Sequence, residues 1–295
     1  MAARCCRSMW AATGALVAAL SLAGGAFAAD HGDTPLLSAI PRNDAKISDL
    51  FAFVRGDELV LALGTNVAIP PSATTYTFPA DLTLRIHIDN DSKVSFDDAA
   101  LNESYGGDIV FPKKIAPEIV IEVTFEEGSP ALTVEGISDV EMSQAQLYAG
   151  LRDDPFIRGP RLGRNVAAVV VALPLSLVLE DQSTLLLWAT AKIPELHGPI
   201  SEHGGRALRS MFPENDGMNT SRPAEHYTKL GTRPDVIIFD TSRPAAYPNG
   251  RELTDDVVDR VGDPRVLGSD APFPSENDRP FLDVFPYLAD PHPAP

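Results

Sequence analysis

Alternation of apolar and polar residues restricts the fold of this chain more than any other feature of its sequence. In "LTLRIHID" (82–89) the apolar side chains from Leu82 to Ile88 fall on one face, and His87 falls on the other. A period of two residues is typical of a half-buried β-strand. The segment "IVIEVTF" (119–125) repeats the pattern. We therefore expect sheets with one packed face and one polar face.

Other segments are apolar nearly throughout, which is typical of central strands that are covered on both faces. They are 59–65, 165–173 and 184–193, and an apolar arm at 51–54 before "RGDE" predicts a hairpin into the first of them. Helical patterns are few: 143–151, with Ser143 as N-cap, and 254–261, with Thr254 as N-cap. This combination predicts a mainly β, antiparallel sandwich-like domain with a few short helices and long loops.

The amino-terminal residues 1–28 have the pattern of a signal peptide. Arg4 and Arg7 form a basic region, an apolar run follows, and "AFA" at 26–28 is a small-x-small cleavage site. Such a signal predicts export to the periplasm or the outside of the cell, with cleavage between Ala28 and Ala29. We expect residues 29–295 to form one β-rich domain, in which the polar, Gly- and Pro-rich segment 198–234 is a long irregular stretch with a functional or packing role.

Composition excludes several classes of protein. Both cysteines, Cys5 and Cys6, lie in the signal peptide, so the mature chain has no disulfide, thiolate metal site or cysteine nucleophile. The net charge of −17 becomes −19 once Arg4 and Arg7 are removed, and so acidic a chain is repelled by nucleic acid. No later apolar run reaches the roughly 20 residues of a membrane span, so no transmembrane anchor is expected. A protein or small-molecule partner stays undetermined.

An acidic loop follows the first alternating strand. In "HIDNDSKVSFDD" the oxygens of Asp89, Asn90 and Asp91 are of the kind that Ca²⁺ prefers. The loop lacks the glycine and the bidentate glutamate of an EF-hand. The alternative interpretation is a turn in which the Asp and Asn side chains bond their own backbone. We expect the turn, with calcium as the competing hypothesis.

The segment "LRDDPF" (151–156) is a second candidate polar site. Asp153 and Asp154 can act as a carboxylate pair in which one member has a raised pKa for proton transfer. The alternative is an ion pair with Arg152 that stabilises a chain reversal. Because no histidine lies nearby in the sequence, we favour the ion pair.

Three later histidines are candidate metal ligands. His197 and His203 flank "GPISE", and His226 follows in "AEHY". Two imidazoles with a carboxylate can bind zinc and leave one position open for water. Their spacing matches no recurrent ligand pair on a helix or a strand, so the pattern favours ordinary structural histidines.

Signal cleavage would itself create a candidate copper site. The mature chain would begin Ala29-Asp30-His31, whose amine, backbone amides and imidazole provide four nitrogens in a plane. Square-planar nitrogen ligation suits Cu(II) or Ni(II), not zinc or calcium. The competing interpretation is that His31 and Asp33 attach the amino terminus to the body of the domain by hydrogen bonds, and this is the one that we favour.

The order of several motifs resembles the bacterial family labelled domain of unknown function 4331. The motifs are "DHGDTP" (30–35), "SDLFAF" (48–53), "IHIDND" (86–91), "GLRDDPFI" (150–157), "GRNV" (163–166), "RPDVIIFD" (233–240), "PNGRELTDDVVD" (248–259) and "FPYLADPH" (285–292). The resemblance implies one exported domain, and the family has no established activity. Gly32 and Asp33 replace the family's Arg and Glu, and Ser92 and Lys93 replace part of its "DNDGDG" loop, which makes calcium less expected here.

One of these motifs has a structural explanation of its own. In "PNGRELTDDVVD", Gly250 is expected at a turn position with positive φ, and Thr254 is expected to cap a helix whose first turn carries Asp255 and Asp256. Arg251 is expected to tie that helix to the sheet. The motif therefore predicts a fold-determining contact.

The sequence lacks the local signatures of α/β-hydrolases, phosphate loops, zinc proteases and dinucleotide folds. The leading hypothesis is an exported binding or accessory protein of the cell envelope without strong signs of catalysis. The alternatives are a metal-dependent enzyme in which His31, Asp33 and a later histidine converge on one metal, and a cation-binding scaffold at Asp89 to Asp91. Proximity of His31 to another histidine would favour the enzyme.

Overall fold

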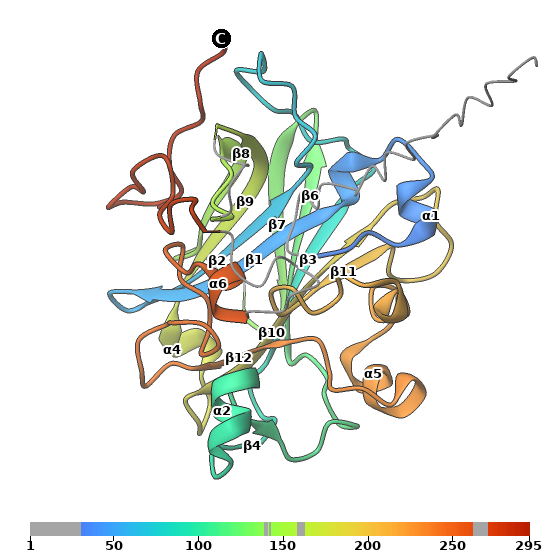
Figure 1. Ribbon diagram of the computed structural model, residues 1–295, viewed down its shortest axis with the longest axis vertical. Helices are drawn as coiled ribbons and strands as arrows, with labels where there is room; N and C mark the ends of the chain where they lie inside the picture. Colours follow the sequence, from blue (N-terminus) through green and yellow to red (C-terminus); the bar gives the residue numbers. More distant parts are fainter. Residues whose placement is uncertain (1–30, 139–140, 142, 158–162, 262–270) are drawn as a thin grey trace, which may run out of the picture.

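A computed structural model of the chain describes residues 31–138, 141, 143–157, 163–261 and 271–295. Two open antiparallel sheets make up most of it (Figure 1). The predicted mainly β, sandwich-like class with few short helices and long loops is confirmed. The signal peptide lies outside the described residues.

The first sheet has four strands in the order β1-β2-β9-β8. Their bounds are Ile47–Arg55 (β1), Glu58–Thr65 (β2), Asn165–Pro174 (β9) and Gln146–Asp153 (β8). β1 and β2 form the predicted hairpin, and β2 also pairs with β9 along its whole length. β2 and β9 are buried on both faces, as their continuous apolar runs predict.

The second sheet has the order β11-β10-β3-β6-β7, and β12 pairs with β10 as well. Its strands are Glu202–Gly204 (β11), Thr184–Lys192 (β10), Thr83–Asp89 (β3), Ile119–Glu126 (β6), Ser129–Glu135 (β7) and Ile237–Asp240 (β12). In β6, buried residues alternate with partly exposed ones, as the sequence pattern predicts. A separate two-stranded sheet joins β4 (Val94–Ser95) to β5 (Asp108–Ile109).

The main core lies between the two large sheets. Leu61 of β2 and Val169 of β9 belong to the same buried cluster as Ile86 of β3 and Ile121 of β6. These side chains lie on the strand faces that the two sheets turn toward each other, so burying those apolar faces accounts for the packing of the two sheets.

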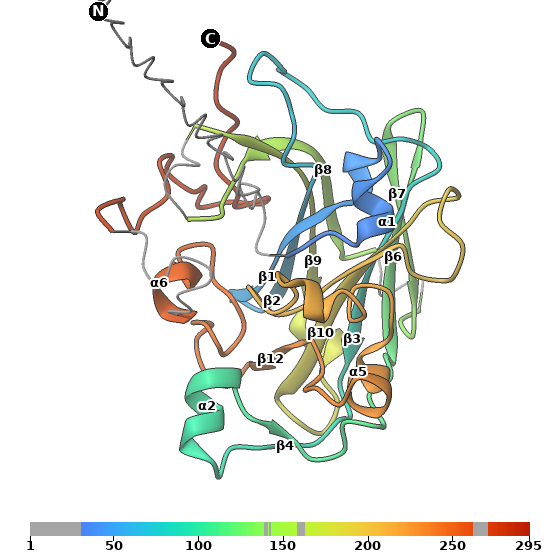
Figure 2. The same ribbon diagram turned by 45° about the vertical axis from the view of Figure 1, so that its right-hand side comes forward.

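The outer face of the first sheet is covered by the carboxyl-terminal part of the chain. Phe51 and Phe53 of β1 pack with Leu253 and Leu288 in a second cluster. In Figures 1 and 2 the red carboxyl-terminal segment lies beside this sheet, next to β8. A chain segment in place of a third sheet therefore keeps both faces of β1 and β9 dry.

Helices are short and lie outside the sheets. They are α1 (Pro35–Ser38), α2 (Ala99–Tyr105), α4 (Leu175–Val178), α5 (Pro223–Leu230) and α6 (Val257–Val261), with 3-10 turns η1 (Asn43–Ala45) and η2 (Pro213–Asn215). In the described part of the chain, no helix has both the length and the apolar character needed to cross a membrane.

Two helical predictions need correction. The pattern at 143–151 is not a helix, because Gln146–Asp153 forms the edge strand β8 and pairs with β9 throughout. Pairing with an existing buried strand overrides the helix preference of its Ala, Gln and Leu residues. The second helix begins three residues later than predicted, and Asp256 accepts from the Asp259 amide in place of the expected Thr254 cap. Gly250 does have a positive φ of 66°.

The segment 198–234 is less irregular than predicted. It contains the short edge strand β11 and the helix α5, and its 3-10 turn η2 lies between them. β11 pairs with only three residues of β10, which is too short a stretch to produce a visible alternation in the sequence.

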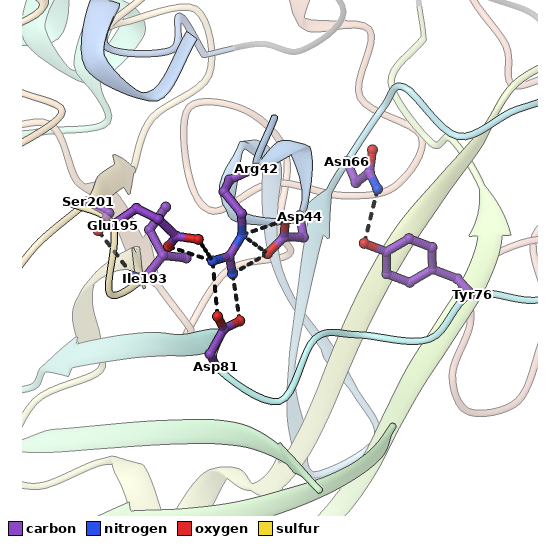
Figure 3. Close-up of polar contacts among 8 residues, drawn as sticks. All are labelled: Arg42, Asp44, Asn66, Tyr76, Asp81, Ile193, Glu195 and Ser201. Atoms are coloured by element: carbon purple, nitrogen blue, oxygen red, sulfur yellow. Dashed lines mark hydrogen bonds and ion pairs between the residues drawn. The ribbon is translucent and has the colours of Figure 1, made fainter. Parts of the chain in front are cut away.

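Arg42 holds three separate segments together next to the amino-terminal helix α1 (Figure 3). Its guanidinium lies 2.9 Å from a carboxylate oxygen of Asp44 and 2.9 Å from one of Asp81, and it also bonds Glu195. These acids come from η1, from the entry to β3 and from the segment after β10. The Arg42 side chain is 11% exposed and that of Asp44 9%, so this contact is shielded from water, whereas Asp81 and Glu195 are largely exposed.

Candidate functional site

The polar face of the second sheet forms the floor of a groove. Two rows of side chains cross it, set by the strand register: Trp188, His87, Val120 and Glu135 in one, and Thr190, Arg85, Glu122 and Thr133 in the other. The predicted placement of His87 on the polar face is therefore confirmed.

Three loops form the walls of this groove. Ile115 to Pro117 precede β6, Pro199 and Ile200 precede β11, and Arg222 and Pro223 begin α5. The cavity has a volume of about 450 Å³. That volume falls within the range of small-molecule sites, roughly 300–1,000 Å³. We call this cavity the sheet groove.

A stacked pair of rings lies in the sheet groove. The His87 and Trp188 rings are nearly parallel, at 10°, with centroids 5.1 Å apart. His87 Nε2 lies 2.9 Å from the Thr190 hydroxyl, which holds the imidazole in place. Burial, followed by the nearby His203 and Arg85, lowers the pKa of His87 to about 3. The imidazole is thus neutral at physiological pH and presents a flat, uncharged surface.

Four charged side chains line the sheet groove, and two of them form an ion pair. Arg85 and Glu122 neutralise each other in an ion pair of 2.6 Å. Arg222 is exposed at one wall, and the Glu225 carboxylate accepts from its backbone amide at 3.2 Å, while Glu225 forms its ion pair with Lys229. Glu135 lies in the β7 strand on the far side of His87. A ligand therefore meets a positive charge at one wall and a negative charge on β7.

A second polar cluster joins the end of β8 to the carboxyl-terminal segment. His292 Nε2 lies 3.0 Å from Asp153 Oδ1 and 3.1 Å from Asp278 Oδ1. The three ligand atoms lie within 4.8 Å of one another. We call Asp153, Asp278 and His292 the carboxylate-histidine cluster.

Burial dominates the electrostatics of Asp153 in this cluster. Its side chain is 1% exposed. Burial raises the pKa of Asp153 to about 7, a hydrogen bond from Asn277 opposes the rise, and the negative charge of Asp278 adds to it. The sequence interpretation of "LRDDPF" lacked a histidine partner for Asp153, and the fold provides one more than a hundred residues away.

Arg152 and Asp154, which flank Asp153 in the sequence, make contacts outside the carboxylate-histidine cluster. Arg152 pairs with Asp290 at 2.7 Å and lies over the Tyr148 ring, so its ion pair is with the carboxyl-terminal segment. Asp154 accepts from the Phe156 amide at 3.1 Å, as in a local turn. The two adjacent aspartates therefore have different surroundings.

The acidic loop after β3 adopts the turn that the sequence favours. Asp89 accepts from the amide and hydroxyl of Ser92 and from the Ala116 amide, and Asn90 donates to Val178 O. The fold adds Glu118, whose carboxylate lies within 4.8 Å of those of Asp89 and Asp91. Both Asp89 oxygens are already used by backbone and hydroxyl donors.

His203 and His226 meet in the interior, and His197 is exposed. The rings of the first two are 5.1 Å apart, and His203 Nε2 bonds the carbonyl of Asp235 at 2.8 Å. His226 Nδ1 accepts from the Asp235 amide, and its Nε2 faces backbone carbonyls. Burial lowers the pKa of each imidazole to about 4. Both nitrogens of His226 are thus used by the backbone.

The amino terminus of the described chain is fastened to the domain. His31 is buried, and its Nδ1 lies 3.2 Å from the Ser48 carbonyl. Asp33 forms an ion pair of 2.9 Å with Lys46. Ala29 and Asp30, the other residues of the copper hypothesis, lie outside the described residues. Copper binding through the imidazole of His31 would require this side chain to leave its buried position.

In the described part of the chain His31 lies close enough to Glu202 and His203 to affect the pKa of each, but it belongs to no group of three potential ligands, so its convergence with Asp33 and a later histidine on one metal stays a prediction. Gly204 of β11 faces His31, because a Cβ at Gly204 would lie 3.2 Å from His31 Nε2. His203 precedes Gly204 in the same strand, so its side chain lies on the opposite face, where it meets His226. Two groups of three potential ligands are found among the described residues, and neither contains His31.

Sequence reasoning missed Asp278, Glu118 and Trp188 as site residues. In the sequence, Trp188 is one residue of an apolar run. Its position on the same sheet face as His87 follows from the pairing of β10 with β3. His292 belongs to a motif noted above, "FPYLADPH", but no spacing relates it to Asp153.

No protein-family model matches the chain, and neither a curated protein nor a solved structure is significantly similar to it.

Proposed function

We propose that this protein is an exported binding protein that holds a small planar organic acid in the sheet groove. The observation that carries the proposal is the flat His87–Trp188 stack in a cavity of about 450 Å³ with the Arg222 guanidinium at its wall. Ligand sites are mostly apolar cavities with a few placed polar groups, and this one has that composition.

The charges define how such a ligand would lie. Arg85 is neutralised by Glu122, so Arg222 is the cation left to receive a carboxylate. Glu135 on β7 would repel a second anionic group. A monoanion with its ring against His87, the more exposed member of the stack, and its carboxylate toward Arg222 satisfies both conditions.

Trp188 provides the readout. The chain has two tryptophans, Trp10 in the signal peptide and Trp188, so after cleavage the emission comes from the groove alone. Benzoate, benzamide and benzylamine share one ring and differ in charge. We expect benzoate to change Trp188 emission and to bind more tightly than the other two, in fluorescence and calorimetric titrations.

Variants at the wall test the role of charge. R222Q should weaken benzoate binding by about tenfold and leave benzamide binding unchanged, since one charge-assisted contact contributes on the order of 1.4 kcal/mol. K229Q removes a cation from the same helix, outside the groove, and should have no effect. Equal benzoate affinities in R222Q and the parent protein, or no benzoate binding at millimolar concentration, would contradict the proposal.

We further propose that the protein is exported and that it is related to the family labelled domain of unknown function 4331. Residues 1–28 support export by their charge, apolar run and cleavage pattern. Mass spectrometry of protein from the native compartment should find Ala29 as the first residue. An intact amino terminus in protein recovered from the cytoplasm would contradict it.

A further inference from the structure

We infer that Asp153, Asp278 and His292 form a binding site for one divalent transition-metal ion, such as Zn²⁺. The site is distinct from the sheet groove, because it joins the end of β8 to the carboxyl-terminal segment on the opposite sheet. The inference is therefore independent of the proposed ligand of the groove.

The donor atoms face one another in a way that hydrogen bonding alone does not satisfy. His292 Nε2 forms a hydrogen bond of 3.1 Å with Asp278 Oδ1, and it lies 3.0 Å from Asp153 Oδ1 without the geometry of a hydrogen bond. Asp153 Oδ1 is buried and accepts no hydrogen bond of suitable geometry in the described part of the chain. A cation between these atoms would serve an unprotonated Nε2 and both carboxylates at once.

The remaining atom of each carboxylate is held from outside the cluster. Asn277 donates to Asp153 Oδ2 at 2.6 Å, and the Gly163 amide donates to Asp278 Oδ2. These bonds leave the two Oδ1 atoms directed toward His292. Outer contacts of this kind orient ligands and strengthen metal sites.

The backbone of His292 is also fixed. The Asn165 side chain accepts from the His292 amide at 2.7 Å and donates to its carbonyl at 3.1 Å. Asn165 begins β9, which pairs with β8 directly opposite Asp153. The imidazole and Asp153 are therefore positioned from the same pair of strands.

The ligand set indicates which ions fit. An imidazole nitrogen suits Zn²⁺, Co²⁺ and Ni²⁺ better than Ca²⁺ or Mg²⁺, which prefer oxygen alone. Three protein ligands leave a fourth position for water, as in sites where the metal is accessible. The cluster of Asp89, Asp91 and Glu118 lacks a nitrogen ligand and carries no such inference, but it provides a control.

The test is to measure metal binding to the mature protein, expressed with its signal peptide and without a histidine tag. Bound metal is first removed with a chelator. Calorimetry with Zn²⁺ should give one site, and Co²⁺ should give visible absorption bands characteristic of nitrogen and oxygen ligation. D278N and H292Q should each weaken Zn²⁺ binding by more than about tenfold, since even outer contacts contribute 10- to 100-fold. D91N and D290N should bind like the parent protein.

Stability separates loss of a ligand from loss of the fold. Zn²⁺ should raise the melting temperature of the parent protein and of D91N, because a ligand of the folded state stabilises it. Without metal, D278N and H292Q should melt close to the parent protein, since both residues are partly exposed. Absence of Zn²⁺ binding, or binding that survives both D278N and H292Q, would overturn the inference.

Discussion

Arg251 donates to Asp49 at 2.7 Å across 202 positions of sequence, and each side chain is 1% exposed. The guanidinium also lies 4.1 Å from the centre of the Phe51 ring. The backbones of Arg251 and Ala52 exchange hydrogen bonds of 3.0 and 2.9 Å. From the sequence, Arg251 is expected to tie the helix to the sheet, and its contacts join the segment that precedes α6 to β1.

Removal of Arg251 should destabilise the protein strongly. R251M leaves Asp49 buried without its guanidinium, and breaking a buried ion pair from one side costs about 3–5 kcal/mol. Chemical denaturation should show this loss, and the double variant D49N/R251M should recover part of it because no uncompensated charge remains. A loss below about 1 kcal/mol in R251M would contradict this prediction.

Arg42 should contribute more to stability than an arginine with a single ion pair. In R42Q the carboxylates of Asp44, Asp81 and Glu195 lose their shared cation (Figure 3), and we expect the free energy of unfolding to fall by about 1–3 kcal/mol. R55Q, which breaks a single and more exposed pair with Glu252, should cost less than about 1 kcal/mol. Equal losses in the two variants would contradict the prediction.

The buried histidines should make stability depend on acid. The folded pKa values of His203 and His226, each about 4, lie below the value of 6.5 for an exposed imidazole. Between these values the unfolded chain binds more protons, so stability is complete above about pH 6.5 and is lost as the pH falls toward 4. Each histidine contributes up to about 3 kcal/mol.

The measurement is the free energy of unfolding of H226Q and the parent protein from pH 4.5 to pH 7. The parent protein should lose more stability on acidification than H226Q, which retains the contributions of His203 and His87 but lacks that of His226. H197Q changes an exposed histidine and should leave the pH dependence unaltered. Identical pH profiles for H226Q and the parent protein would contradict the prediction.

Glu202 should act with the opposite sign. Its side chain is 1% exposed, and burial raises the pKa well above the usual 4.5. The folded state therefore holds a proton that the unfolded chain releases, and this contribution to stability is lost as the pH rises above 4.5. E202Q mimics the protonated form, so its stability relative to the parent protein should increase from pH 4.5 to pH 8 in denaturant titrations. A constant difference would contradict this.

Strands were the most predictable elements because their signal is local. The alternation at 82–89 and the apolar run at 165–173 each correspond to a strand of the structure. The edge strand β8 was mistaken for a helix, since its composition favours helix and its strand form depends on β9. A partner strand is not a local property.

The candidate sites were less predictable than the strands. Alternation placed His87 on the polar face, but the stack with Trp188 depends on the pairing of β3 with β10. Asp153 was recognised as a polar candidate, yet its histidine partner lies 139 positions later in the chain. Such proximity requires the carboxyl-terminal segment to pack against the first sheet.

Local sequence patterns were sufficient to predict the mainly β class, six of the twelve strands in the described part of the chain, the turn at Gly250 and the absence of cysteine from residues 29–295. These follow from short-range sterics, apolar periodicity and residue type. The strand that β8 pairs with, the position of His31 and the carboxylates that face His292 depend on the packed fold. Contacts between distant segments depend on how the sheets bury their apolar faces, and that packing is a property of the whole chain.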